Sequence, residues 1–160
     1  MSSAGKFVGR DELARRVAAW KDAGETVALA NGLFDLLHVG HLRYLEEAAR
    51  EADRLVVAVN ADASARALKG PDRPIVPADE RAELIAAFSC VDLVTVFDEA
   101  TVEPLLRAVR PDVHCKGTDY TADTVPEREA ARALGIRVAI TGDAKSHATR
   151  DLIAQIRGGR

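Results

Sequence analysis

Apolar residues are arranged along the chain in two patterns that alternate. One pattern is a short apolar run without polar alternation, which is typical of strands buried on both faces of a parallel sheet. These runs cover residues 26–31, 54–60, 93–97, 112–116 and 136–141. The other pattern spaces apolar residues three or four positions apart and predicts helices. These helices cover residues 11–24, 41–52, 77–88, 101–109, 124–135 and 149–156.

Five buried strands that alternate with helices predict an α/β fold with a Rossmann-like, doubly wound, five-stranded parallel sheet. We expect residues 26–31 to form a central strand of this sheet. Pro77 and the acidic residues after it suit the first turn of a helix. Thr124, with Glu127 three residues later, matches a capping box and predicts another helix start.

Length and composition favour one domain with a packed interior. The chain has 160 residues, 48% of them hydrophobic, and no repeat, linker or low-complexity run divides it. We therefore expect a single domain over residues 1–160, in which residues 1–24 form an N-terminal helical extension.

Charge and hydropathy narrow the classes of function. The net charge of −3 gives no basic excess for nucleic-acid binding. We see no apolar run of transmembrane length, and the first twelve residues lack the apolar core of a signal peptide. Cys90 and Cys115 do not form a CxxC pair and are interpreted as reduced thiols. These features predict a cytoplasmic protein that binds neither membranes nor nucleic acids.

Polar and small residues cluster where the predicted strands end. In doubly wound sheets, ligands bind beyond the carboxyl ends of the strands. Four stretches leave strands at that edge: NGLFDLLHVGH, NADASARALKG, KGTDY and TGDAKSHAT. The chemistry of the protein is therefore expected in these four loops.

The first of these loops places His38 and His41 around Gly40, which leaves three interpretations. The histidines could cap or pack the following helix. They could bind a metal, but HExxH spacing is absent, and His114 and Cys115 on another strand point to opposite faces. They could bind phosphate, because a helix N-terminus attracts anions, glycine permits close approach and imidazoles donate hydrogen bonds. We favour phosphate and expect no metal site made of protein ligands.

The stretch GLFDLLHVGH resembles the HxGH motif of the nucleotidyltransferase superfamily, whose members include cytidylyltransferases. The GxxxxGK[ST], GxGxxG and GxSxG patterns of other phosphate-binding or nucleophilic enzymes are absent. From Thr26 onward the chain is similar to the adenylyltransferase domains that make ADP-heptose. RPDVHCKGTDY resembles a PD…KGxDY element that is selective for this branch, the bacterial D-glycero-β-D-manno-heptose 1-phosphate adenylyltransferases.

The resemblance implies an enzyme that transfers AMP from ATP to the heptose 1-phosphate, giving ADP-heptose and pyrophosphate for lipopolysaccharide biosynthesis. It implies ATP as co-substrate, Mg²⁺ accompanying the triphosphate, small-molecule partners and a homodimer. One alternative is a cytidylyltransferase acting on glycerol 3-phosphate or a related phosphate, and another is a different sugar-1-phosphate adenylyltransferase. The alternative from another class is a non-catalytic nucleotide-binding domain.

The resemblance also assigns roles to residues. The expected catalytic residues are His38, His41 and Lys69. The expected nucleotide-binding residues are Asn31, Gly32, Leu33, Phe34, Gly40, Lys116, Gly117, Asp119, Ser146 and Thr149. The expected substrate-binding residues are Asp35, Asn60, Arg81 and Tyr120.

Several of these residues also have ordinary structural interpretations. Asp35 could order its loop, Lys69 could be a solvated loop lysine, and Arg81 could lie on a solvated helix face. The family commonly has a hydroxyl triplet before the last helix, whereas this chain has SHATR with Ala148 in the middle. His147 and Lys145 are candidates to replace the missing contact.

Overall fold

The carboxyl ends of five parallel strands define the edge at which the candidate site lies. The computed structural model describes residues 3–144 and 147–158. The strands are β1 (Val27–Gly32), β2 (Arg54–Asn60), β3 (Leu93–Phe97), β4 (Val113–Gly117) and β5 (Arg137–Thr141). They form one sheet in the order β3-β2-β1-β4-β5, in which every neighbouring pair is parallel. The predicted sheet is confirmed, with β1 at its centre.

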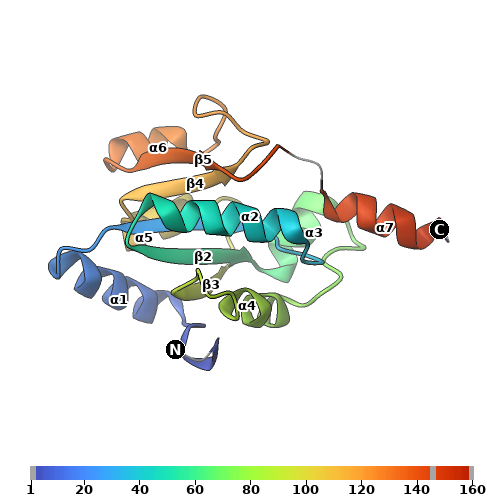
Figure 1. Cartoon of the computed structure of the whole chain (residues 1–160), viewed down its shortest axis with the longest axis horizontal. Helices are drawn as coiled ribbons and strands as arrows, with labels where there is room; N and C mark the ends of the chain where they lie inside the picture. Colours follow the sequence, from blue (N-terminus) through green and yellow to red (C-terminus); the bar gives the residue numbers. More distant parts are fainter. Residues whose placement is uncertain (1–2, 145–146, 159–160) are drawn as a thin grey trace.

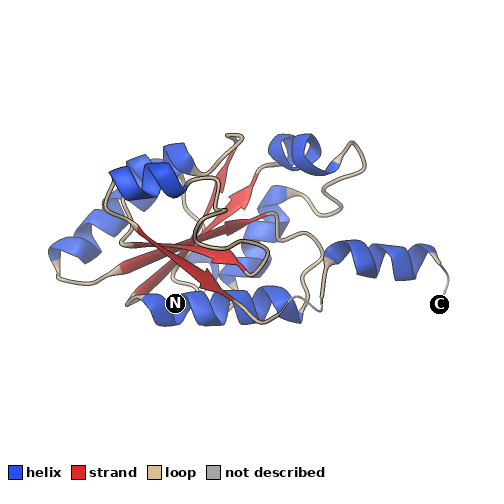
Figure 2. Ribbon diagram, turned by 90° about the horizontal axis from the view of Figure 1, so that it is seen from above, coloured by secondary structure: helices blue, strands red, loops and turns tan. Residues whose placement is uncertain are grey.

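Helices lie on both sides of the twisted sheet (Figure 2). The α-helices are α1 (Arg10–Asp22), α2 (Val39–Ala48), α3 (Asp62–Lys69), α4 (Ala78–Ala86), α5 (Glu103–Val109), α6 (Arg128–Ala133) and α7 (Thr149–Arg157). Short 3-10 helices η1 (Ser3–Gly5) and η2 (Ala49–Glu51) complete the described elements. Over these residues, no helix is long and apolar enough to cross a membrane.

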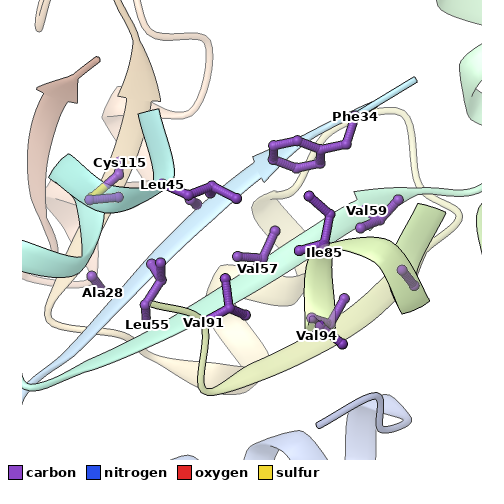
Figure 3. Packing of buried hydrophobic residues seen from close by; sticks show 14 of the residues in the cluster. Ala28, Phe34, Leu45, Leu55, Val57, Val59, Ile85, Val91, Val94 and Cys115 are labelled. Atoms are coloured by element: carbon purple, nitrogen blue, oxygen red, sulfur yellow. The ribbon is translucent and has the colours of Figure 1, made fainter. Parts of the chain in front are cut away.

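Two hydrophobic clusters attach the helices to the two faces of the sheet. On one face, Leu45 of α2 and Ile85 of α4 pack against strand residues such as Val57 (Figure 3). On the other face, Leu13 of α1 and Leu106 of α5 pack against alternate strand residues. Burying both faces explains why the strand sequences lack polar alternation.

The first helix, α1, packs into the hydrophobic core and is not only an extension that precedes the domain. Leu13 and Val17 of α1 are fully buried, and Phe7 forms a parallel bridge to Val94 of β3. By contrast, α7 buries none of its described residues and extends away from the rest of the protein (Figure 1).

Two expectations about local structure were wrong. NADASARALKG was expected to be a strand-exit loop, but Asp62–Lys69 forms α3, which turns Ser64 and Ala65 inward. Lys69 is therefore the last residue of a helix and not a loop residue. The capping box at Thr124 does not form, because its hydroxyl bonds within the turn to Thr121 and α6 starts only at Arg128.

Candidate active site

A cavity of about 850 Å³ opens beyond the carboxyl ends of the strands. It lies where β1 is flanked by β2 on one side and β4 on the other. The connection from β1 to β2 passes over one face, whereas the connection from β3 to β4 passes over the opposite face. This divergence leaves the opening that binds ligands in doubly wound folds.

Most of the predicted site residues meet in this cavity. Those that line it are Asn31, Gly32, Leu33, Phe34, Asp35, His38, Gly40, His41, Asn60, Lys69, Lys116, Gly117, Asp119, Tyr120 and Thr149. Ser146 and Lys145 lie outside the described residues. Arg81 does not line the cavity.

The two histidines form a capping box at the start of α2. His38 is the N-cap residue, and its Nδ1 accepts a hydrogen bond from the Gly40 N–H at 3.1 Å. The His41 Nδ1 accepts from the His38 N–H at 3.3 Å. The two imidazole rings are stacked, with centroids 3.9 Å apart. Capping and ligand binding are therefore compatible roles, because the capping bonds use only the Nδ1 atoms.

These bonds also fix which ring nitrogen carries the proton. A neutral imidazole that accepts a hydrogen bond at Nδ1 carries its hydrogen on Nε2. Both rings line the cavity, so each brings an N–H donor to a helix N-terminus that already favours anions. Two such donors suit a phosphate oxygen that accumulates negative charge.

Gly40 is required by the histidine ring itself. A Cβ added at Gly40 would lie 2.9 Å from Cε1 and 3.0 Å from Nδ1 of His38. The sequence suggested that this glycine admits a phosphate, but the space is occupied by the imidazole that caps the helix. The glycine in HxGH therefore permits the capping geometry of the first histidine.

The loop between β1 and α2 is conformationally strained. Phe34 and Leu36 both have left-handed backbones, with φ of 52° and 47°, which non-glycine residues rarely adopt. The Phe34 ring packs over Gly32, where an added Cβ would lie 3.3 Å from it, and its centroid is 5.5 Å from that of His41. Gly32 thus leaves room for the aromatic ring beneath the histidine.

Asp35, between the two strained residues, holds this loop in place. Its carboxylate is almost fully buried and accepts hydrogen bonds from the N–H groups of Ile75 and Val76 and from Arg73 Nε, at 2.9, 3.0 and 2.7 Å. Burial raises the pKa of Asp35, but the backbone bonds and Arg73 outweigh it and leave the pKa lowered. Its carbonyl accepts from the Thr149 hydroxyl at 2.5 Å. Asp35 orders the loop, as one of its two interpretations expected.

Arg81 differs from both of its expected roles, since it is neither solvated nor placed to contact a ligand in the cavity. Its side chain is 1% exposed and donates to Leu33 O at 2.5 Å and Val76 O at 2.8 Å. It also pairs with Asp62 of α3 at 2.9 Å. Arg81 therefore links α4 to the strained loop, because its guanidinium donates to one carbonyl group on each side of that contact.

A polar pair made of the buried His114 of β4 and the partly buried Asn31 of β1 lies beside the cavity. His114 Nε2 is 2.8 Å from Asn31 Oδ1, and burial lowers the pKa of His114 to about 3. A neutral His114 therefore donates to the Asn31 side chain. The Tyr44 hydroxyl donates to Cys115 O at 2.8 Å and links α2 to β4. The interpretation of His114 as a core histidine fits this placement.

Sequence reasoning missed or underrated several residues that line the cavity. They are Tyr44, Arg73, Phe97, Thr101, Glu127, Thr141, His147 and Arg150. Thr141 begins one of the four strand-exit stretches and could have been found by position, and Arg73 lies three residues after another of them. Glu127 had been assigned to a capping box, and only the tertiary structure turns it toward the cavity.

The chemistry available in the cavity is binding and charge stabilisation. Cationic side chains reach it from Lys69, Arg73 and Lys116, together with the two imidazoles and the N-terminus of α2. Within residues 3–144 and 147–158, no group of three or more His, Cys, Asp or Glu side chains could hold a metal ion. The cationic groups and helix N-terminus suit a substrate that carries phosphate groups.

Comparisons with known proteins agree with this geometry. The family model described as "Cytidylyltransferase-like" matches residues 29–152. The chain is 42% identical over 155 residues to the bifunctional protein HldE of Methylobacillus flagellatus, covering 97% of this chain and 32% of that protein. It is 47% identical over 133 residues to HldE of Syntrophotalea carbinolica, covering 83% of this chain and 27% of that protein. The chain thus spans about a third of the length of these relatives.

A solved structure resembles the chain over more of its own length. It is the lipopolysaccharide core biosynthesis protein from Thermoplasma volcanium GSS1, with 34% sequence identity and a TM-score of 0.64. The match covers 73% of this chain and 94% of that protein. The residues matched by the family model, 29–152, include the β1–α2 loop that carries the histidines.

The close contact at Gly40 leads to a first prediction. Gly40→Ala should displace the His38 ring and weaken its Nδ1 bond while the protein stays folded, because alanine favours helices by up to about 1 kcal/mol over glycine. Histidine ¹H–¹⁵N spectra should show altered His38 ring signals. Gly117→Ala is the matched control, since a Cβ there meets nothing within 4 Å. Unchanged His38 signals in Gly40→Ala would show that the glycine is not required by the ring.

The buried carboxylate leads to a second prediction. Asp35→Asn should lower the free energy of unfolding at pH 7 by about 2 kcal/mol, a typical loss for hydrogen bonds to a charged group. Because the folded-state pKa is lowered, this contribution is present above the unfolded pKa of about 3.9 and is lost as pH falls through the folded-state value. Urea unfolding of both proteins should therefore show a difference that shrinks below about pH 4.

The exposed Asp22→Asn variant serves as the control for this measurement and should change stability by less than about 0.5 kcal/mol. A difference between wild type and Asp35→Asn that stays constant from pH 7 to pH 3 would contradict the role of the ionised carboxylate.

Proposed function

The chain belongs to the cytidylyltransferase-like family, and from this premise we propose that it transfers AMP from ATP to D-glycero-β-D-manno-heptose 1-phosphate. The products are ADP-heptose and pyrophosphate. The observation that carries the proposal is the stacked pair His38 and His41, which caps α2 over the cavity between β1 and β4.

The choice of substrates is supported by sequence. The KGTDY stretch resembles the ADP-heptose branch of the superfamily. The names of the relatives, bifunctional protein HldE and lipopolysaccharide core biosynthesis protein, point the same way. The cavity of about 850 Å³ is of the size that holds small-molecule ligands.

The proposed reaction is a direct in-line displacement. An oxygen of the sugar phosphate forms a bond to the α-phosphorus of ATP, while the bond from that phosphorus to the oxygen bridging to the β-phosphate breaks. The electron pair leaves with pyrophosphate. Such transfers depend on positioning and charge stabilisation and need no covalent intermediate with the protein.

Different residues around the cavity would act on different parts of the substrates. The Nε2–H groups of His38 and His41, with the N-terminus of α2, would stabilise charge on the transferring phosphoryl group. Lys69 and Arg73, which line the β2 side of the cavity, would neutralise phosphate charge from the opposite direction. Asp35 would hold Arg73 in position through its Nε.

Magnesium would come with the nucleotide. Mg²⁺ typically keeps several waters and binds substrate phosphates with few protein ligands, which fits the lack of a three-ligand cluster among the described residues. It would supply neutralising charge to the triphosphate. The Mg²⁺ and the homodimer are predictions that rest on the resemblance, and the cytoplasmic location is a prediction that rests on the charge, hydropathy and cysteine pattern of the sequence.

The competing activity within the family is cytidylyl transfer to glycerol 3-phosphate. Both reactions need the same phosphate chemistry and differ in the base and in the acceptor. A pyrophosphate-release assay separates them, with ATP, CTP, GTP and UTP each tested against heptose 1-phosphate, other sugar 1-phosphates and glycerol 3-phosphate.

We expect the highest kcat/KM for ATP with D-glycero-β-D-manno-heptose 1-phosphate. A clear preference for CTP with glycerol 3-phosphate would overturn the substrate assignment and leave the family intact. No turnover with any pair, in protein that still binds nucleotide, would favour the non-catalytic alternative.

A further inference from the structure

Two buried charges of opposite sign lie on the β4 side of the cavity. Lys116, near the end of β4, is 8% exposed, and Glu127, just before α6, is 5% exposed. Both residues line the cavity on the β4 side of the central strand β1, whereas Lys69 and Arg73 follow β2 on its other side. Charged groups are rarely buried to this degree unless they are paired or serve a function.

The two charges influence each other without forming an ion pair. Burial lowers the pKa of Lys116, and the negative charge of Glu127 acts in the opposite direction. The Lys116 ammonium lies over the Tyr120 ring, 4.6 Å from its centroid. Among the described residues, no hydrogen bond or ion pair joins Lys116 to Glu127. The ammonium is thus held in place by the ring and keeps capacity to donate into the cavity.

Glu127 is the unusual member of the two. Its Oε2 is buried and has no hydrogen-bond partner within residues 3–144 and 147–158. A buried carboxylate oxygen without a partner is unfavourable for folding. Its position on the cavity wall offers an explanation, since a bound ligand that carries a hydrogen-bond donor would satisfy it.

The charge of Glu127 also restricts the ligand. A carboxylate next to the ammonium repels phosphate, so this part of the cavity is poorly suited to the triphosphate contact expected for Lys116. A neutral group that has an acceptor beside a donor fits both charges, because the ammonium donates and the carboxylate accepts.

We propose that Lys116 and Glu127 form a specificity subsite for a neutral, hydrogen-bonding part of a substrate and not for its phosphates. This inference rests on the proposed function for the choice of ligands. Two substrate parts share the required chemistry: the edge of adenine, with its ring nitrogen beside an amino group, and adjacent hydroxyls of the heptose.

The Kd of each probe, measured by calorimetry, tests the subsite whether or not the protein turns the substrates over. The probes are ATP, D-glycero-β-D-manno-heptose 1-phosphate and pyrophosphate. The variant is Glu127→Gln, which keeps the shape and removes the charge. Its control is Glu129→Gln, since the Glu129 side chain is 77% exposed and, among the described residues, forms an ion pair with Arg128 alone.

We expect Glu127→Gln to raise the Kd for one organic probe about tenfold or more, the size expected for a lost charge-assisted hydrogen bond. A change for ATP assigns the subsite to the base, and a change for heptose 1-phosphate assigns it to the sugar. The Kd for pyrophosphate should stay within about twofold, and Glu129→Gln should bind all three probes normally.

Unchanged binding of both organic probes would overturn the proposal. Tighter pyrophosphate binding, by about tenfold, would also overturn it, because it would place phosphates beside the carboxylate. Thermal melts supply a further criterion, since neutralising a buried carboxylate with an unpartnered oxygen should not lower Tm. A marked loss of Tm in Glu127→Gln would assign the residue a structural role and contradict the proposal.

The test of the subsite and the test of the proposed function give independent results. Wild-type protein that shows no turnover in the pyrophosphate-release assay contradicts the proposed function. The binding pattern of Glu127→Gln is measured independently of that result and decides only the subsite.

Discussion

The buried carboxylate of Asp35 is the interaction on which the geometry of the site depends. It lies between Phe34 and Leu36, whose left-handed backbones are unfavourable by themselves. Three hydrogen bonds to the segment 73–76 compensate for that strain, and Arg81 holds the same segment and Leu33 from the core. The loop that leads to the histidines is thus fixed by tertiary contacts and not by local preference.

This fixed loop places the N-terminus of α2 and the imidazole groups of His38 and His41 beyond the carboxyl end of the central strand β1. The loop delivers His38 as the N-cap of α2, and the capping bonds orient both imidazoles through their Nδ1 atoms. Because these groups are oriented before any ligand arrives, little reorganisation is needed when charge develops on a phosphoryl group. The site is consistent with a family whose members transfer nucleotidyl groups through positioning.

The sequence predicted the sheet well because its strands are buried on both faces, and such strands have a pattern that needs no tertiary information. β2 and β3 coincide with the predicted runs, and β1 is the central strand. Helix α3 was missed because its exposed residues are polar and its inward residues, Ser64 and Ala65, are small. Short helices of this kind give little hydrophobic signal.

The site was predictable where residues leave strands and was not where long-range contacts decide the role. His38, His41 and Lys116 follow from their position at strand ends. Arg81 looked like a solvated helix residue because nothing in its local sequence indicates that Asp62 and two carbonyl groups surround it. Glu127 was assigned to a capping box, and only the fold shows that its Oε2 lies at the cavity wall without a partner among residues 3–144 and 147–158.

The most direct test of the account is steady-state pyrophosphate release by His38→Ala and His41→Ala, with thermal melts alongside. If the imidazoles stabilise the transition state, each variant should lose about 10²–10³ in kcat, with a smaller change in the KM for ATP. Tm should fall by a few degrees at most, because each variant loses one capping bond of α2 but neither ring belongs to the hydrophobic clusters, so both variants should stay folded at the assay temperature. Near-normal kcat in both variants would contradict the account, as would a loss of activity that only follows a loss of folded protein.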